Sequence, residues 1–152
     1  MTRVRASTVV PGRIIDAEEL WYDQYRWAAW IDGFGHVLSL DAEWPNEGAR
    51  LVWESPPRGR GRVQEVVTAY EARTGQTVSV EDGQLTGAQT VTFEVAGPDD
   101  VQVTLALDYK LKHFTPLKAA SDLFLIRHDM TGSLKRTLER FGHERRAEIT
   151  GS

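Results

Sequence analysis

The sequence contains no cysteine, and this absence excludes several kinds of chemistry at once. Disulfide bonds, thiolate nucleophiles and cysteine-ligated metal sites all need that side chain. The four histidines are scattered, and no pair has the spacing of metal ligands on one face of a helix or strand. A glycine-rich phosphate loop, a Ser/His/Asp arrangement and a G-x-S-x-G elbow are also missing. We therefore expect no metal site and no cofactor.

Positive charge is also scarce, because 18 Lys and Arg residues face 22 Asp and Glu residues, a formal net charge of -4. Nucleic-acid binding needs a positive surface, so this balance argues against nucleic acid as a partner. No apolar run approaches the roughly 18 residues of a transmembrane segment. No apolar segment follows residues 1–5 as it would in a signal peptide. We expect a cytoplasmic protein that is a monomer or a weak homodimer.

The remaining composition is that of a globular domain, with 41% apolar and 26% charged residues in a chain of 152. This length predicts a single domain, which we place at residues 1–142, followed by a flexible C-terminal tail at residues 143–152. The Arg-Gly run at residues 58–62 has the composition of an RNA-binding tract but is far too short. We interpret it as a solvated hairpin loop.

Strands dominate the middle of the chain. Residues 3–10 predict an opening strand, and a period of two in hydrophobicity runs from Phe34 to Leu111. Its clearest segment extends from Val101 to Leu111, whereas residues 62–70 lack clean alternation, which leaves their register open. Glycine- and proline-rich turns separate the segments, so the six strands of this region form adjacent antiparallel hairpins.

Helices are predicted at the two ends of this strand region. Asp16 as an N-cap with Glu19 three residues later resembles a capping box and starts a short helix. A second short helix follows over residues 26–32 and ends at Gly33. An amphipathic helix from about Pro116 to Gly142 closes the chain. Because the sheet is apolar on one face only, this helix must cover it, and a curved sheet wider than the helix leaves a cavity between them.

Arg127 occupies an unusual place in the closing helix. At about 100° per residue it falls within about 10° of the centre of the apolar stripe. A positive charge in that position needs a partner or a wet cavity. We interpret Arg127 as an anchor for a carboxylate, enolate or phenolate of a ligand. The alternatives are an ion pair with an acidic residue of the sheet, or a shift in helix phase that brings the side chain to solvent.

The order of these elements resembles that of the START/Bet v 1-like helix-grip superfamily, also called SRPBCC. The resemblance covers residues 3–142 and is carried by Leu20-Trp21, by the segment from Arg26 to Gly33, and by residues 134–141 of the closing helix. Within the superfamily the sequence is most similar to the polyketide cyclase/dehydrase-like branch. The resemblance implies an α+β fold, with about seven antiparallel strands curved around a long C-terminal helix and two short helices after the first strand.

The resemblance also implies a deep, mostly apolar pocket for lipids, polyketides or other hydrophobic molecules, without a shared catalytic motif. We expect inward-facing residues of the sheet and helix to line this pocket: Arg127, Tyr109, Trp53, Phe93, Leu107, Leu123, Phe124 and Met130. Tyr109 and His113 are acid/base candidates, although Tyr109 can also be a core residue and His113 a strand-exit residue. Trp53 can equally belong to the ligand site or to the core.

Three functions stay open from the sequence. The first is binding of a small hydrophobic, aromatic or carboxylated molecule. The second is a cyclase/dehydrase-type enzyme in which Arg127 stabilises an enolate and Tyr109 or His113 moves the proton. The third is an interaction or stress-response module whose cavity is vestigial.

Overall fold

The computed structural model describes residues 1–112 and 120–151, and for residues 120–124 it describes the backbone alone. The chain begins with strand β1 and ends with the long helix α3, in the order that the sequence predicts. The elements are β1 (Thr2–Pro11), α1 (Ile14–Tyr22), the 3₁₀ turn η1 (Gln24–Arg26), α2 (Trp27–Trp30), β2 (His36–Leu40), β3 (Arg50–Glu54), β4 (Arg62–Glu71), β5 (Gly75–Glu81), β6 (Leu85–Gly97), β7 (Asp100–Leu111) and α3 (Ala120–Thr150).

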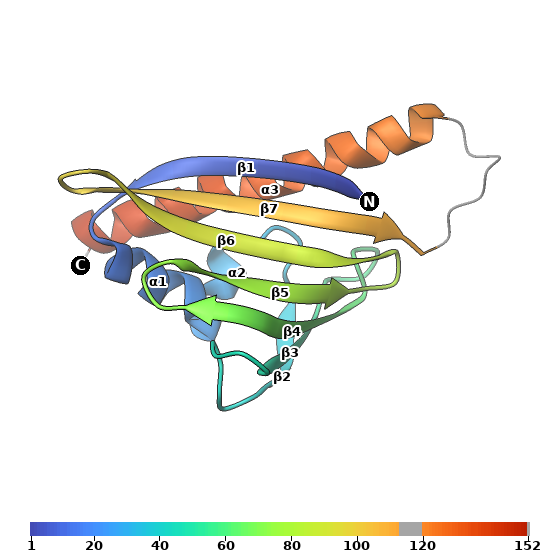
Figure 1. The fold of residues 1–152 in the computed structure, drawn as a ribbon, viewed down its shortest axis with the longest axis horizontal. Coiled ribbons are helices and arrows are strands. Elements are labelled where there is room, and N and C mark those ends of the chain that lie inside the picture. The colour runs from blue at the N-terminus through green and yellow to red at the C-terminus, as the bar shows by residue number, and fades with distance from the viewer. Residues whose placement is uncertain (113–119, 152) are drawn as a thin grey trace.

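The strands form one antiparallel sheet in the order β1-β7-β6-β5-β4-β3-β2. Each strand from β2 to β6 pairs with the next one along the chain, as short turns require. β1 instead pairs with β7, and Val4 lies opposite Leu107. The sheet curves, and α3 runs behind β1 and β7 while α1 and α2 lie at one end (Figure 1). The predicted helix-grip fold is confirmed.

The strand whose register the sequence left open is β4. Its pairing with β5 shifts between Val67 and Ala69, so a bulge interrupts the alternation. A bulge inserts one extra residue and moves the following side chains to the opposite face. Before the bulge, Val63, Glu65 and Val67 face inward. Because the charged Glu65 stands between two inward valines, the sequence of β4 does not alternate cleanly between apolar and polar residues.

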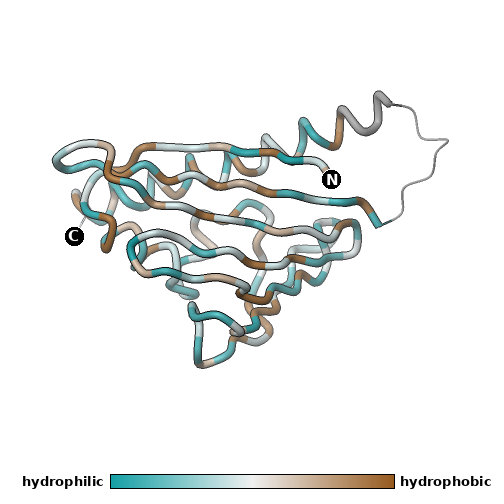
Figure 2. Tube along the Cα trace, in the orientation of Figure 1, coloured by the Kyte–Doolittle hydropathy of each residue, from teal (hydrophilic) through white to brown (hydrophobic). Residues whose placement is uncertain are grey.

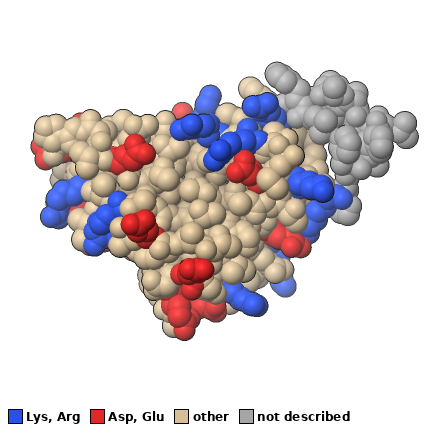
Figure 3. Space-filling view, in the orientation of Figure 1, with Lys and Arg blue, Asp and Glu red and all other residues tan. Residues whose placement is uncertain are grey.

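The two faces of the sheet differ in polarity, and hydrophobic and hydrophilic residues alternate along most strands (Figure 2). The outer face is largely uncharged and carries threonines such as Thr92 and Thr104, with basic side chains grouped near the start of β1 (Figure 3). Arg3 and Arg5 are exposed in that group, whereas Val4 between them is 4% exposed. The inner face therefore holds the core and everything that the fold can enclose.

Aromatic side chains of the short helices fill one end of the enclosed space. Trp21 lies 4.6 Å from Trp30 and 5.2 Å from Phe141 of α3, measured between ring centroids. Trp27 and Trp30 are 2% and 1% exposed. A buried indole contributes on the order of 200 Å² of contact area, so this cluster fixes α1 and α2 against the sheet and α3.

The first helix begins differently from the sequence prediction. Arg13, not Asp16, is the N-cap residue, and Asp16 is the third helical residue, whose carboxylate accepts a hydrogen bond of 2.9 Å from the Arg13 backbone N–H. This is the reciprocal half of a capping box, which an acidic residue at the third position supplies. The predicted box of Asp16 and Glu19 is therefore wrong, because the helix begins three residues earlier and Asp16 takes the position expected of Glu19.

The phase of α3 removes Arg127 from the core-facing side. Ile126, Met130 and Leu134 follow at intervals of four residues along the face that packs on the core. Since one residue turns a helix by about 100°, Arg127 lies about 80° from the centre of the narrower face that Ile126 and Met130 share near the start of α3. Its side chain is exposed, so the predicted inward position of Arg127 is wrong.

None of the described helices is long and apolar enough to cross a membrane.

The C-terminal end of α3 extends beyond the predicted boundary. The helix continues past Gly142 to Thr150, whereas the sequence predicts a flexible tail from residue 143. Arg145 explains the extension, because its side chain turns inward and is only 9% exposed. It donates a 3.1 Å hydrogen bond to the Pro11 carbonyl and lies 2.7 Å from the Glu148 carboxylate. These contacts fasten the last helical turns to the end of β1.

Replacing Arg145 with methionine should lower the free energy of unfolding by about 2 kcal/mol, because it removes two hydrogen bonds of a charged group while keeping an apolar stem. Chemical denaturation of the purified protein measures this. Arg146→Met is the matched control, since Arg146 is exposed on the same turn and its loss should change stability by no more than about 0.5 kcal/mol. Equal effects of the two substitutions would show that Arg145 does not fasten the helix.

Candidate functional site

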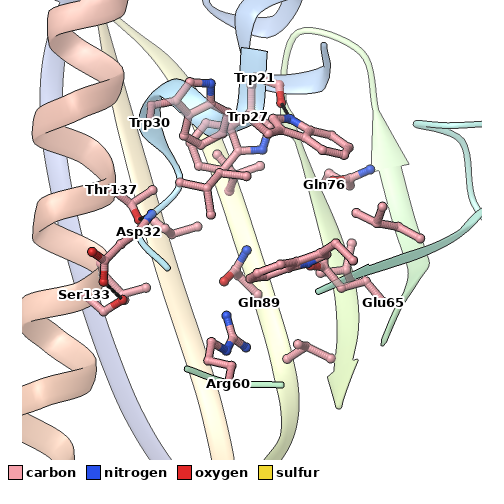
Figure 4. Close-up of a pocket in the computed structure, with 18 of the residues that line it drawn as sticks. Trp21, Trp27, Trp30, Asp32, Arg60, Glu65, Gln76, Gln89, Ser133 and Thr137 are labelled. Atoms are coloured by element: carbon pink, nitrogen blue, oxygen red, sulfur yellow. Dashed lines mark hydrogen bonds between the residues drawn. The ribbon is translucent and has the colours of Figure 1, made fainter. Parts of the chain in front are cut away.

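A cavity lies between the inner face of the sheet, the short helices and α3. It has about 80 Å³ of space for the centres of water-sized molecules. Its apolar walls come from β3, β5, β6, β7 and the tryptophans, and its polar groups come from every side. The polar lining consists of Asp32, Arg60, Glu65, Gln76, Gln89, Ser133 and Thr137. Figure 4 shows these side chains around the space, with the helical tryptophans at one end and Arg60 at the other.

Five tryptophans line the cavity, and three of them use their N–H groups within the protein. The indole N–H of Trp27 donates to the Trp21 carbonyl at 2.8 Å, and that of Trp44 donates to the Tyr22 carbonyl at 3.1 Å. The Trp53 N–H donates to Glu65 at 2.8 Å. These three indoles therefore offer the cavity ring surface rather than hydrogen-bond donors.

Glu65 is a carboxyl group inside the cavity. β4 presents it inward between Leu51 of β3 and Val80 of β5, which are its neighbours across the sheet. Glu65 is half-buried and lines the cavity. Burial raises the pKa of the Glu65 carboxyl above its usual range, although the hydrogen bond from Trp53 and the charge of Arg60 oppose this rise. One carboxyl oxygen accepts the Trp53 N–H, which leaves the other available to a ligand.

Arg60 brings a positive charge to the same space. It comes from the loop between β3 and β4, and its guanidinium lies 5.3 Å from the centre of the Trp53 ring. Its Nε donates a 2.9 Å hydrogen bond to Asp82, whose side chain is only 2% exposed. Asp82 also accepts the backbone N–H groups of Gln84 and Leu85 at 2.8 and 3.0 Å. Asp82 thus holds both the β5–β6 turn and the cavity arginine.

Two glutamines add neutral polar groups to the sheet side of the cavity. Gln76 is 6% exposed, and its amide nitrogen donates a 3.0 Å hydrogen bond to the Pro45 carbonyl. This contact fixes the amide orientation, so the Gln76 oxygen is left as an acceptor. Gln89 has no hydrogen bond from its side chain to any other residue that the structure describes. The sheet side therefore presents acceptors from Glu65, Gln76 and Gln89.

Asp32 closes the side of the cavity next to α3. It follows α2 and accepts hydrogen bonds from Ser133 at 2.7 Å and Arg136 at 3.2 Å, while its backbone N–H donates to Thr137 at 3.0 Å. Burial raises the pKa of Asp32, but the hydrogen bonds from Arg136 and Ser133 and the charges of Arg136 and Arg140 outweigh it and leave the pKa below its usual range. Asp32 is therefore ionised and fully engaged in joining the α2–β2 loop to α3.

The sequence predicted one of these lining residues, Trp53. Trp53 is 3% exposed and belongs both to the core and to the cavity wall, and its contact with a ligand stays a prediction. Arg127 does not line the cavity, and a contact between Arg127 and a ligand stays a prediction. Arg60 is the cavity cation, so the interpretation of residues 58–62 as a wholly solvated loop is wrong at this position.

The other predicted site residues lie in the core or outside the described side chains. Phe93 and Leu107 are buried core residues and Met130 packs partly on the core, but none of these three lines the cavity. Tyr109 is 3% exposed and also lies outside the cavity lining. Burial raises its pKa against the opposing effects of the Arg127 charge and a hydrogen bond with Thr2. The remaining predicted residues, His113, Leu123 and Phe124, have side chains outside the described part of the chain.

Strand parity could have found two of the missed residues. Gln76 shares the parity of Val78 and Val80, and Gln89 shares that of Val91 and Phe93, so both face inward. A polar residue at an inward position is the signal of a site rather than of a core. Among the described residues, no three His, Asp or Glu side chains gather as a metal site would need.

Comparison with solved structures finds the same fold in proteins of low sequence identity. The Zhui aromatase/cyclase from Streptomyces sp. R1128 has a TM-score of 0.76 at 11% identity, covering 97% of this chain and 95% of the other. A START superfamily protein from Mycobacterium smegmatis has a TM-score of 0.68 at 16% identity, covering 93% and 97%. Truncated norcoclaurine synthase from Thalictrum flavum has a TM-score of 0.67 at 12% identity, covering 93% and 91%.

These likenesses establish a START-like helix-grip architecture and nothing finer, because identities this low do not carry function from one protein to another. No protein-family model and no curated protein matches the sequence at a significant level. The function must therefore be argued from the cavity itself.

Proposed function

We propose that the protein binds a small hydrophobic molecule with an aromatic ring in the cavity between the sheet and α3. The observation that carries this proposal is the combination of five indole walls with a few inward polar groups in one enclosed space. Ligand sites are typically concave, mostly apolar and equipped with a small number of oriented polar groups. The START-like fold supports a ligand-binding role of this general kind.

The size of the space favours a compact ligand. One buried water needs about 10–15 Å³ of space for its centre, so the 80 Å³ present corresponds to several waters. A single ring with a short polar substituent suits this volume, whereas a long acyl chain does not. The open space also argues against the vestigial-cavity hypothesis, which expects side chains to fill the site.

A second candidate function is proton-transfer catalysis of the cyclase/dehydrase type. It is favoured by one observation, a buried carboxyl with a raised pKa that faces a cavity. Glu65 would then supply or take the proton, and Arg60 would stabilise negative charge as it develops. Turnover of a keto substrate that Glu65→Gln abolishes would support this candidate; binding without turnover favours the first.

Filling the cavity tests the binding proposal. Val91→Phe enlarges a lining residue of β6 that is 3% exposed, and it should weaken binding of single-ring aromatic compounds by about tenfold or more, since a loss of 1.4 kcal/mol already gives that factor. Tryptophan fluorescence and calorimetry measure the affinity.

Val95→Phe is the matched control, because Val95 lies on the same strand but is 75% exposed. Its affinity should equal that of the unmodified protein. Native mass spectrometry of the freshly purified protein adds the mass of any small molecule that co-purifies. Equal affinities for all three proteins would place ligand binding outside this cavity.

A further inference from the structure

The sheet side of the cavity has carboxyl and amide oxygens that the hydrogen bonds within the protein leave open, and the charges around it are unbalanced. Trp53 engages only one oxygen of Glu65, and Pro45 engages only the amide nitrogen of Gln76. The second Glu65 oxygen and the Gln76 oxygen therefore remain as acceptors, and Gln89 can turn its own oxygen toward the same space. Three of the five indole N–H groups are already used inside the protein, whereas the Trp30 N–H has no partner among the described residues, so the open acceptors lie on the sheet side of the cavity.

Charge is unbalanced in the same direction. Two buried carboxyl groups, Glu65 and Asp82, share one guanidinium, that of Arg60. Asp82 is the direct partner of Arg60, because it accepts the Arg60 Nε hydrogen bond at 2.9 Å. An ionised Glu65 would thus leave one negative charge uncompensated in a desolvated space, which is costly. Either a proton or a cation must be present beside it.

The other charged groups near the cavity, within residues 1–112 and 125–151, do not supply that cation. Asp32 with Arg136 and Arg140 forms a separate cluster in which both guanidinium groups bond to Asp32, and both side chains are about half exposed, at 52% and 48%. The Arg60 guanidinium lies against the Trp53 ring and is held there by Asp82. In the described part of the chain, the charged groups around Glu65 are therefore Arg60 from the β3–β4 loop, Asp82 after β5 and, toward α3, the Asp32 cluster.

We infer that the cavity selects a protonated organic amine, whose ammonium group binds Glu65 and whose ring stacks within the tryptophan cluster. The ammonium donates hydrogen bonds to the free oxygens of Glu65, Gln76 and Gln89. Indole faces favour cations as well as rings, since their quadrupole attracts positive charge. This inference rests on the proposed function, because it names the chemical class of the ligand that the cavity binds.

Binding exchanges one cation for another at Glu65. When an ammonium ion enters while the carboxyl is protonated, the carboxyl proton leaves to solvent and the ammonium takes its place beside the carboxylate. When a neutral amine enters, the same proton moves from the Glu65 oxygen to the amine nitrogen, and none is released. Either route ends with an ammonium–carboxylate pair in a space that previously held a neutral carboxyl.

The test compares three probes that share one ring: 2-phenylethylamine, 2-phenylethanol and 3-phenylpropionate. Calorimetry of the full-length protein should give the amine an affinity about tenfold to a hundredfold above that of the alcohol, the range for a hydrogen bond between charged groups. The anion should bind most weakly. Titrations in two buffers of different ionisation enthalpy should detect release of a proton when the ammonium form binds.

Glu65→Gln separates the carboxyl from the rest of the cavity, since an amide oxygen can still accept the Trp53 N–H. The variant should lose the preference for the amine and keep its affinity for the alcohol. If the alcohol binds the unmodified protein as tightly as the amine, the inference is overturned while the binding proposal stands. If none of the three probes binds, the binding proposal fails with it. The probe comparison on the unmodified protein decides this even where the variant does not fold.

Discussion

Replacing Asp82 with alanine should lower the free energy of unfolding by about 3–5 kcal/mol, because a buried carboxylate that accepts three hydrogen bonds is lost. The substitution removes the partner of Arg60 and the acceptor for the backbone N–H groups of Gln84 and Leu85. Those donors would stay inside the β5–β6 turn without a partner, and each such loss is costly. Urea or guanidinium denaturation gives the change directly.

Two further substitutions define the source of that effect. Asp82→Asn keeps an oxygen for the turn but loses the charge, so its cost should be smaller, about 1.5–3 kcal/mol. Glu81→Ala removes an adjacent carboxylate that is 57% exposed and pairs with Lys112, and its cost should stay below about 1 kcal/mol. If Glu81→Ala proves as costly as Asp82→Ala, burial of Asp82 is not the cause.

The second large effect concerns the pH dependence of stability. Because burial raises the pKa of Glu65, the folded protein binds this proton more tightly than the unfolded chain does. The contribution of Glu65 to stability is therefore greatest below the ordinary carboxyl pKa of 4.5 and falls as pH rises toward the raised value. The slope can reach about 1.4 kcal/mol per pH unit for one group. Above the raised pKa the loss is complete and the slope returns to zero.

Glu65→Gln should remove this loss, so the variant should become progressively more stable than the unmodified protein as pH increases from 4.5. Carboxylates with lowered pKa, such as Asp16 and Asp32, contribute stability that is lost as pH falls, and they contribute equally to both proteins. Thermal or chemical unfolding between pH 4 and pH 8 measures the difference. Glu71→Gln, at an exposed position of β4, should give a curve parallel to that of the unmodified protein. Parallel curves for Glu65→Gln would show that Glu65 is not buried.

The sequence predicted the architecture because the fold depends on local signals. Alternation along the strands, turn residues between them and one long amphipathic helix leave few ways to bury the apolar face. Trp53 was found by the same signal, since it shares the inward parity of Leu51. The register of β4 could not be predicted, because a bulge breaks the alternation of its side chains.

The site was harder to predict because it depends on contacts between distant segments. Arg60 enters the cavity only because its loop folds back onto Trp53 and meets Asp82, 22 residues away in the chain. Arg127 leaves the core because the contact face of α3 at that point follows Ile126 and Met130, and an averaged stripe over 27 residues conceals such a local phase. Sequence periodicity predicts which face of a strand or helix a side chain occupies. Whether that side chain lines a cavity depends on its position to within an ångström or two, which periodicity does not give.

The pairing of β1 with β7 has a consequence for how the molecule assembles. Val4 and Leu107 are neighbours in space but stand at opposite ends of the strand region. During synthesis β1 stays unpaired until β7 has left the ribosome. The hairpins formed by β2 to β6 can close as soon as their strands emerge. Such long-range closure slows folding and prolongs the interval in which a strand edge is open to other chains. Co-translational folding of this protein is therefore limited by its last third.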